Sequence, residues 1–492
     1  MSRAIVIGSG IAGLASALRL RAKGFEVLVF EANSHAGGKL HAFEKNGYRF
    51  DYGPSLFTMP QYVDEIFGLF SEDPRDHFNY SREETICNYF WEDGTTFTAH
   101  SDKNQFIKEA SDQFNEPYRN IEKYLENSQK KYERTSELFL KKSLHKASTY
   151  LNKEALKGVL NLGRLDIQKS LHEVNQSYFQ NPKLVQLFNR YATYNGSNPY
   201  STPGIMSLIP QLEMQFGTFY PKGGMHEISQ SLYRLAVAKG VQFTFNTEVE
   251  EVLLEKGVIK GISTHGKTVP AELVVCNMDI FSAYQTILKK AKKPSRTLKQ
   301  ERSSSALIFY WGINRSFSEL GLHNIFFSDN YRQEFEAIFK KHSLIDDPTI
   351  YLNITSKKES EHAPASGENW FVMINAPSNK GQDWKKLTQM AKQSILKKLN
   401  RILKVDIASL IEAEEILDPV RIEVDTRSHE GSLYGTSSNS KFAAFLRHPN
   451  FSSSIKNLYF CGGSAHPGGG IPLCLLSAKI VCDLIPESDA LH

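Results

Sequence analysis

The strongest constraint on the fold is a strand, a glycine-rich turn, a helix and a second strand that follow one another within the first 31 residues. The first strand is the β-branched run AIVIG (residues 4–8), and a helical pattern extends through GSGIAG to Lys23. The second strand, FEVLVFE, ends at Glu31. These three elements form a βαβ unit.

The turn of this unit has the glycine spacing of a dinucleotide-binding loop. Its glycines allow a tight turn, close approach of the backbone to a pyrophosphate, and close packing of the helix on the strand. The N-terminus of the helix then faces the phosphates. Glu31 is placed to accept hydrogen bonds from a ribose, and its charge disfavours the 2′-phosphate of NADP. The residues predicted to hold the ADP half are Gly8, Gly10, Ile11, Ala12, Gly13 and Glu31.

Further glycine-rich segments decide which dinucleotide the chain holds. AGGKL (residues 36–40) and YRFDYGPSLF (residues 48–57) have no helical pattern, and a simple NAD domain does not need them. Residues 457–480, NLYFCGGSAHPGGGIPLCLLSAKI, contain another strand, a glycine cluster and a helix. The motifs therefore lie near both ends of the chain.

In combination, these motifs resemble the two-part FAD site of flavin desaturases and amine oxidases, and most closely that of phytoene-desaturase-like carotenoid desaturases. Many carotene desaturases carry Arg where this chain has Lys39, and DYGPSLFTMP (residues 51–60) is similar to the hydroxylated-carotenoid 3,4-desaturases. The resemblance implies FAD as the cofactor. It also implies a flavin site formed by Gly38, Lys39, Pro54, Ser55, Leu56, Val249, Asn277, Gly463, Gly470, Ile471 and Pro472.

Segments from the middle of the chain are similar to the same desaturases, in the same order. They are YNGSNPYSTPG (residues 194–204), FYPKGGMHEI (residues 219–228) and VVCNMD (residues 274–279). Tyr194, Asn195 and Tyr200 in the first of them are candidate substrate-side groups, with a purely structural role as the alternative.

The predicted fold class is α/β, or α+β for the whole chain. A Rossmann-like FAD-binding domain is expected to be discontinuous, because its motifs lie at both ends. It would comprise residues 1–70, 216–285 and 416–492. A substrate-binding domain with a mixed sheet would comprise residues 71–105 and 286–415, and residues 106–215 would form a helical lid or membrane-facing region.

Periodicity predicts the main elements outside the glycine-rich motifs. Five runs between Val241 and Cys276, separated by turn residues, predict a β-meander. Four apolar runs between residues 303 and 377, together with a hairpin at residues 85–98, suit one substrate-side sheet. Residues 383–404 predict a helix whose apolar stripe is core, namely Leu387, Met390, Ala391, Ile395, Leu399 and Ile402.

Composition excludes several classes of protein. A chain of 492 residues with 41% hydrophobic and 23% charged residues suits a folded enzyme better than a small binding module. Lys and Arg outnumber Asp and Glu by only 58 to 54, so we expect no nucleic-acid partner. Five cysteines without a close pair argue against a disulfide framework and a zinc site, and we expect no metal.

Two segments suggest contact with a membrane surface. Residues 128–170 hold ten Lys or Arg against four Asp or Glu, which suits an anionic bilayer or a solvated helical lid. PGIMSLIPQLEMQFG (residues 203–217) is too apolar for an exposed helix and is expected to line a tunnel or touch lipid. The first strand leaves no room for a signal sequence. The expected location is therefore cytoplasmic, with peripheral association with the inner face of a membrane.

The resemblance implies an FAD-dependent carotenoid desaturase, an oxidoreductase acting on CH–CH groups. Moving a C40 polyene into water costs about 0.8 kcal/mol per CH₂-sized unit, so the substrate is expected to be drawn directly from lipid. The expected reaction is hydride transfer from the polyene to flavin N5, which introduces a terminal 3,4 double bond in a hydroxylated acyclic or monocyclic carotenoid.

Other activities of the same fold remain as alternatives: a phytoene-type desaturase, a carotenoid cis-trans isomerase, an FAD amine oxidase, or a non-catalytic carotenoid carrier. No catalytic residue is identified, because a cation spread over the polyene can lose its proton to a weak base or to water. The electron acceptor is also not identified, since oxygen, a quinone or another carrier needs only access to reduced flavin.

Overall fold

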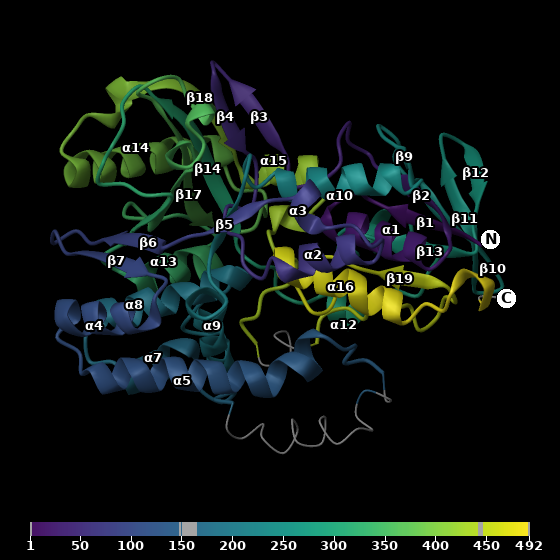
Figure 1. Cartoon of the computed structure of the whole chain (residues 1–492), viewed down its shortest axis with the longest axis horizontal. Helices are drawn as coiled ribbons and strands as arrows, with labels where there is room; N and C mark the ends of the chain where they lie inside the picture. Colours follow the sequence, from purple (N-terminus) through teal and green to yellow (C-terminus); the bar gives the residue numbers. More distant parts are fainter. Residues whose placement is uncertain (1, 147–148, 150–164, 441–445, 491–492) are drawn as a thin grey trace.

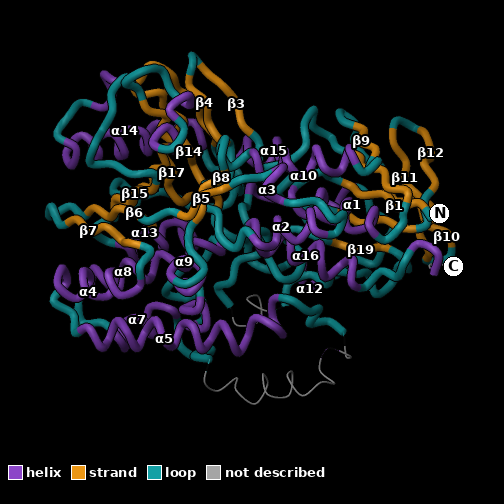
Figure 2. Tube along the Cα trace, in the orientation of Figure 1, coloured by secondary structure: helices purple, strands orange, loops and turns teal. Residues whose placement is uncertain are grey.

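The structure, a computed structural model, describes residues 2–146, 149, 165–440 and 446–490. Two large sheets lie toward opposite ends of the long axis, the parallel sheet on the right of Figure 1 and a seven-stranded sheet on the left. Figure 2 shows the strands gathered in these two regions, with helices around them. The predicted α/β class, α+β for the whole chain, is confirmed.

The first sheet is entirely parallel, and its spatial order is β19-β13-β1-β2-β9. Ile5 in the central strand pairs with Val274 on one side and Leu28 on the other. The sheet thus joins segments from the beginning, middle and end of the chain. Its strands are β1 (Arg3–Ile7), β2 (Glu26–Phe30), β9 (Gln242–Thr244), β13 (Leu273–Cys276) and β19 (Leu458–Phe460).

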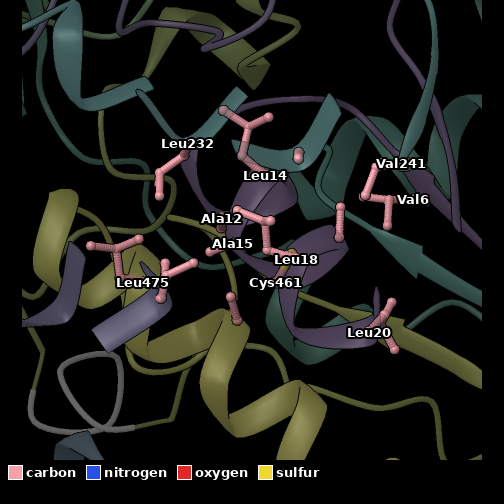
Figure 3. Packing of buried hydrophobic residues seen from close by; sticks show 14 of the residues in the cluster. Val6, Ala12, Leu14, Ala15, Leu18, Leu20, Leu232, Val241, Cys461 and Leu475 are labelled. Carbon is pink, nitrogen blue, oxygen red and sulfur yellow. The ribbon is translucent and has the colours of Figure 1, made fainter. Parts of the chain in front are cut away.

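Helices α1 (Ile11–Ala22), α10 (Glu227–Ala238) and α16 (Ile471–Asp483) pack with one face of this sheet. Figure 3 shows side chains from all three helices meeting in this core, among them Leu14, Leu18, Leu232 and Leu475. Each is almost completely buried, and burying a leucine side chain contributes about 2 kcal/mol. The packing therefore fixes α1 and α16 against each other.

The second sheet has the order β18-β14-β17-β16-β15-β6-β7, and of its strand pairs β15 and β6 are parallel while the others are antiparallel. The predicted substrate-side strands and hairpin are all in it, and β18 adds a strand that the sequence did not indicate. The strands are β6 (Thr85–Phe90), β7 (Thr96–His100), β14 (Ser305–Ile313), β15 (His323–Phe326), β16 (Ile350–Ile354), β17 (Glu368–Ala376) and β18 (Ile411–Leu417).

Helix α14 (Trp384–Leu403) covers one face of the seven-stranded sheet. Ile395 and Leu399 are fully buried in the core cluster that contains alternate residues of the strands. The predicted stripe is wrong at Met390, whose side chain is 39% exposed. Met390 lies at the edge of the stripe, where its angular position around the helix turns it away from the sheet.

The meander predicted between Val241 and Cys276 is only partly present. Strands β10 (Glu251–Glu255), β11 (Val258–Thr264) and β12 (Lys267–Pro270) form a three-stranded antiparallel sheet. The first and last predicted strands are instead β9 and β13 of the parallel sheet. The correction has a physical cause, since these two runs pair with strands distant in sequence rather than with their neighbours.

A group of helices packs against β6 and β7 and forms a separate core cluster. The group consists of α4 (Lys103–Phe114), α5 (Tyr118–Thr135), α7 (Leu171–Tyr178), α8 (Pro182–Asn189), α9 (Pro210–Met214) and the short η4 (Arg190–Asn195) and η5 (Gly204–Leu208). The short η1 (Ser136–Leu140) follows α5 and contributes to a small cluster of its own. Of the basic segment 128–170, residues 147–148 and 150–164 lie outside the described residues. Within the described ranges, we find no helix whose length and apolar character would let it cross a bilayer.

Shorter elements connect these parts. They are β3 (Ala42–Lys45), β4 (Tyr48–Asp51), α2 (Gln61–Gly68), α3 (Pro74–His77), β5 (Tyr80–Arg82), β8 (Phe219–Pro221), α11 (Ile280–Thr286), α12 (Ser295–Leu298), α13 (Tyr331–Glu336), η6 (Ala337–Lys341), η7 (Thr355–Lys357), η8 (Ser360–His362), η9 (Ile407–Leu410), α15 (Pro419–Thr426), η10 (His429–Gly431) and η11 (Ser488–Ala490). The pairing of β5 with β8 joins the segment after α3 to the one before α10.

Candidate functional site

One cavity of about 500 Å³ is lined by both large sheets. Its wall contains every predicted cofactor residue except Gly13. These residues are Gly8, Gly10, Ile11, Ala12, Glu31, Gly38, Lys39, Pro54, Ser55, Leu56, Val249, Asn277, Gly463, Gly470, Ile471 and Pro472. Four segments distant in sequence thus meet around one space, and their role in binding stays a prediction.

Gly13 lies behind the cavity wall, where the helix approaches the turn. A Cβ at this residue would be 2.1 Å from the carbonyl oxygen of Gly8, so only glycine fits. Its amide donates a hydrogen bond to Asn277 Oδ1 at 3.1 Å, while Asn277 Nδ2 donates to the carbonyl oxygen of Cys461 at 3.3 Å. Asn277 therefore ties the first glycine turn to the segment that precedes α16.

Glu31 is buried at the end of β2, yet it lies in the cavity wall. Its Oε2 accepts hydrogen bonds from the backbone amide and the hydroxyl of Ser9, both at 2.7 Å. Its Oε1 accepts from the amide of Asn33 at 2.9 Å. These donors hold the carboxylate in one orientation, and its remaining lone pairs can accept from ribose hydroxyls.

Two helix N-termini open into the cavity. Helices α1 and α16 begin at Ile11 and Ile471, both in the wall, and neither helix has a side-chain cap or an acidic residue in its first turn. Their amides and dipoles therefore favour an anionic or electron-rich ligand. Lys39 adds a cation whose pKa is lowered by burial and whose Nζ donates to the carbonyl oxygen of Leu433 at 3.1 Å.

The other part of the wall is one face of the seven-stranded sheet. Phe371, Met373 and Asn375 alternate along β17, and His323 and Ile325 alternate along β15. Because side chains alternate between the two faces of a strand, Val372 and Ile374 of β17 point away and lie in the core cluster that contains residues of α14. Other wall residues of this part are Ile86, Cys87, Ile308, Tyr331, Thr349, Tyr351 and Leu417.

A buried ion pair lies in the wall beside this face. Arg190 Nη2 is 2.8 Å from Glu213 Oε2, and the same oxygen accepts from the hydroxyl of Tyr191 at 2.5 Å. Tyr194, a predicted substrate-side residue that also lines the cavity, donates to the other oxygen of Glu213. The carboxylate is thus fully occupied by donors, as a buried charge requires.

The other two predicted substrate-side residues lie outside the cavity wall. Asn195 donates to the sulfur of Met206 at 3.4 Å. Tyr200 contacts the guanidinium of Arg332, 4.0 Å from the ring centre, and the ring of His172. In both cases the contacts of the side chain are those of a packed structural residue.

Sequence reasoning missed the cavity residues of β6, β15, β16 and β17. The alternation of side chains along these apolar runs was the available signal, but it does not tell which face of the sheet meets the cofactor-binding part. Among the residues before α16, burial lowers the pKa of His466 to about 4, and its Nε2 donates to the carbonyl oxygen of Lys142 at 2.9 Å.

The site has the features that FAD needs: a glycine turn that a Cβ would fill, an orientated carboxylate at the end of β2 and two uncapped helix N-termini. Among the described residues no group of His, Cys, Asp and Glu side chains could hold a metal ion. Residues 11–486 match the family of flavin-containing amine oxidoreductases, and the chain belongs to that family. FAD is its cofactor.

Two individual relatives and one solved structure are similar to this chain. The chain is 57% identical over 490 residues to the 1-hydroxycarotenoid 3,4-desaturase of Flavobacterium sp. (strain P99-3), with 100% of both chains covered. It is 32% identical to the 4,4'-diapolycopene oxygenase of Methylomonas sp, with 98% of each covered. An oxidoreductase from Methanosarcina mazei shares its fold with a TM-score of 0.66 at 16% identity, over 98% of this chain and 100% of that one.

Proposed function

We propose that this protein is an FAD-dependent carotenoid desaturase that introduces a 3,4 double bond into a hydroxylated acyclic or monocyclic carotenoid. The identity of 57% over the full length of a 1-hydroxycarotenoid 3,4-desaturase is the observation that carries this proposal. The cavity supports it, because one wall is built of dinucleotide-binding turns and the other of a largely apolar sheet face. A long polyene and a flavin can meet in such a space.

Each part of the chain has a definite task in this reaction. FAD, when bound, accepts a hydride from the substrate. The glycine turns, Glu31 and the two helix N-termini hold the ADP half and orient the cofactor. The apolar residues of β15, β16 and β17 exclude water and align the polyene. Proton loss from the adjacent carbon completes the desaturation, and a cation spread over a polyene requires only a weak acceptor for that proton.

The supply of substrate favours a membrane surface. A C40 polyene cannot cross water at a useful rate, since exposure costs about 0.8 kcal/mol per CH₂-sized unit. Our proposal therefore includes peripheral contact with a bilayer, through the helical group that contains α5. Residues in α5 and the following turn carry a local excess of Lys and Arg, which suits anionic lipid.

The proposal is tested with the purified yellow protein and three carotenoids in liposomes: phytoene, a hydroxylated γ-carotene and an all-cis precursor. We expect the hydroxylated substrate alone to lose two hydrogens and to shift its absorbance to the red. Conversion of phytoene alone would make the protein a phytoene-type desaturase. A changed spectrum at unchanged mass would make it an isomerase. If none of the carotenoids reacts although FAD is bound and an acceptor is added, the remaining candidates are an amine oxidase and a non-catalytic carotenoid carrier.

A further inference from the structure

Beside the cofactor-binding turns, the cavity wall contains a short chain of hydrogen-bonded polar groups on the otherwise apolar sheet face. The hydroxyl of Tyr351 is 2.8 Å from Ser55 Oγ and 2.8 Å from His323 Nδ1. All three residues line the cavity. Ser55 belongs to the segment after β4, whereas Tyr351 and His323 belong to neighbouring strands β16 and β15, so the chain bridges the two parts of the site.

The direction of these hydrogen bonds follows from Asn353. Asn353 Nδ2 donates to the carbonyl oxygen of Leu322 at 2.9 Å, which fixes the orientation of the amide, and the same nitrogen is 3.2 Å from His323 Nδ1. Nδ1 must therefore be an acceptor. Burial lowers the pKa of His323 to about 3, so the ring is neutral and its single proton is on Nε2.

Once Nδ1 is an acceptor, the remaining roles are determined. Tyr351 donates its proton to His323, and Ser55 donates to the oxygen of Tyr351. The lone pairs of Ser55 Oγ then have no donor among the described residues, and His323 Nε2 has no acceptor there. A cluster that is buried and incomplete at its cavity end is expected to be completed by a polar group of a ligand.

We propose that Ser55, held by Tyr351 and His323, accepts a hydrogen bond from the hydroxyl group of the carotenoid substrate. This inference deepens the proposed function and rests on it. In a 1-hydroxycarotenoid, carbon 1 is separated from carbon 3 by a single carbon, so the group that binds the hydroxyl must lie beside the flavin end of the site. Ser55 fulfils this, since it lies two residues after Gly53, which packs against the backbone of Lys39.

The other polar cluster of the cavity is less suited to this task. Glu213 already accepts from Arg190, Tyr191 and Tyr194, so it has no need of a further donor. Its charges neutralise each other, and an alcohol added there would have to compete with an ion pair. The Ser55 end offers an acceptor without competition.

The test compares three ligands in phosphatidylcholine–phosphatidylglycerol vesicles: a 1-hydroxylated γ-carotene, its 1-methoxy ether and γ-carotene itself. Binding is measured by quenching of protein fluorescence and turnover by product mass. The methoxy ether keeps the oxygen but cannot donate. We expect wild-type protein to bind the hydroxylated carotenoid about tenfold to a hundredfold more tightly than either of the others.

Tyr351→Phe is expected to reduce this preference about tenfold or more, with little change in binding of γ-carotene. Tyr124→Phe is the control, because it removes a buried tyrosine hydroxyl, 2.8 Å from Asn175 Oδ1, away from the cavity. FAD occupancy, read from flavin absorbance, must stay at the wild-type level for the comparison to apply to substrate. Equal loss for all three ligands, or a preference unchanged in Tyr351→Phe, would overturn the inference.

The two proposals fail in different ways. If wild-type protein converts none of the carotenoids but binds the hydroxylated one selectively through Ser55, the desaturase function is wrong and the hydroxyl site stands. If it desaturates the hydroxylated carotenoid but binds it no better than the methoxy ether, the function stands and the hydroxyl site is wrong.

Discussion

The two parts of the cavity wall are built in different ways. On the side of the parallel sheet, the wall includes glycine turns and the first residues of α1 and α16, where backbone groups can approach a ligand. On the side of the seven-stranded sheet, it consists of side chains that alternate along strands. Backbone groups are the same whatever the residue, so contacts with them suit a cofactor that stays the same among related enzymes. Side chains on a sheet face can be replaced without disturbing the sheet, so they suit a substrate that differs. The difference predicts that substitutions in the first part act on FAD and fold, and those in the second on substrate.

The largest effect is expected for Gly13→Ala. The new Cβ would lie 2.1 Å from the carbonyl oxygen of Gly8, so α1 must move away from the turn. We expect a loss of about 3 kcal/mol in the free energy of unfolding and loss of bound FAD. Thermal unfolding and flavin absorbance measure both.

The control for this substitution is Gly68→Ala at the end of α2, where a Cβ would meet nothing within 4 Å. It should be neutral or stabilise the protein by about 0.5 kcal/mol, since alanine favours the helix. A stable Gly13→Ala protein with full FAD content would contradict the close packing on which the first half of the comparison depends.

A smaller effect is expected for Glu31→Gln. The amide cannot accept at both positions, so the hydrogen bond from the Ser9 amide or that from the Asn33 amide is lost together with the predicted ribose contact. We expect the affinity for FAD to fall by about 2 kcal/mol, or thirtyfold, as measured by titration of apoprotein. Glu26→Gln on the same strand, whose carboxylate forms a partly exposed ion pair with Arg3, should leave FAD affinity unchanged.

On the other side of the cavity, Met373→Ala should act on substrate alone. Its side chain contributes apolar surface to the wall, and we expect kcat/KM for the carotenoid to fall about fivefold to thirtyfold, equivalent to about 1–2 kcal/mol. FAD content should not change. Met390→Ala is the matched control, because Met390 is exposed on α14. If Met373→Ala lost FAD as well, the prediction that this part of the wall acts on substrate alone would be wrong.

The last prediction concerns the free energy of unfolding at acid pH. It involves one histidine on each side of the cavity. Burial lowers the pKa of His323 on the substrate side to about 3 and that of His466 on the cofactor side to about 4. The unfolded chain therefore binds more protons than the folded one between the ordinary pKa of about 6.5 and these values. Stability contributed by the neutral rings is complete above pH 6.5 and is lost as the pH falls.

For each of these histidines the loss should be about 1 kcal/mol per pH unit below pH 6. Unfolding by denaturant at pH 7, 6 and 5 measures it, and His323→Gln should flatten the dependence. A slope unchanged by that substitution would show that His323 does not titrate on unfolding.

The same contrast explains what the sequence could predict. The βαβ unit and its glycines are local signals, and the structure confirms the elements over Ala4–Glu31. Residues 383–404 were also predicted well, since the observed helix is Trp384–Leu403 with Asp383 as its N-cap. In these cases the spacing of residues along the chain is itself the physical cause of the strand, turn or helix that forms.

The sequence could not predict which strands that are distant in the chain pair with each other. The runs that became β9 and β13 look like neighbours of a meander, yet their partners are β2, β1 and β19. Likewise, the alternation on β15, β16 and β17 was visible, but the face that meets the cavity is set by α14, which covers the other one. The role of His323 depends on Tyr351 and Asn353, which only the register of β15 with β16 brings to it.

The pairing of α1 with α16 has a consequence for protein synthesis. Helix α1 begins at Ile11 and α16 at Ile471, so the ribosome adds 460 residues between the two ends of the predicted FAD site. At about 5–20 residues per second this interval is about 20–90 s. Although α10 can cover part of α1 earlier, the apolar surface of α1 that packs with α16 stays uncovered throughout that time, which makes chaperone shielding important for the yield of folded enzyme.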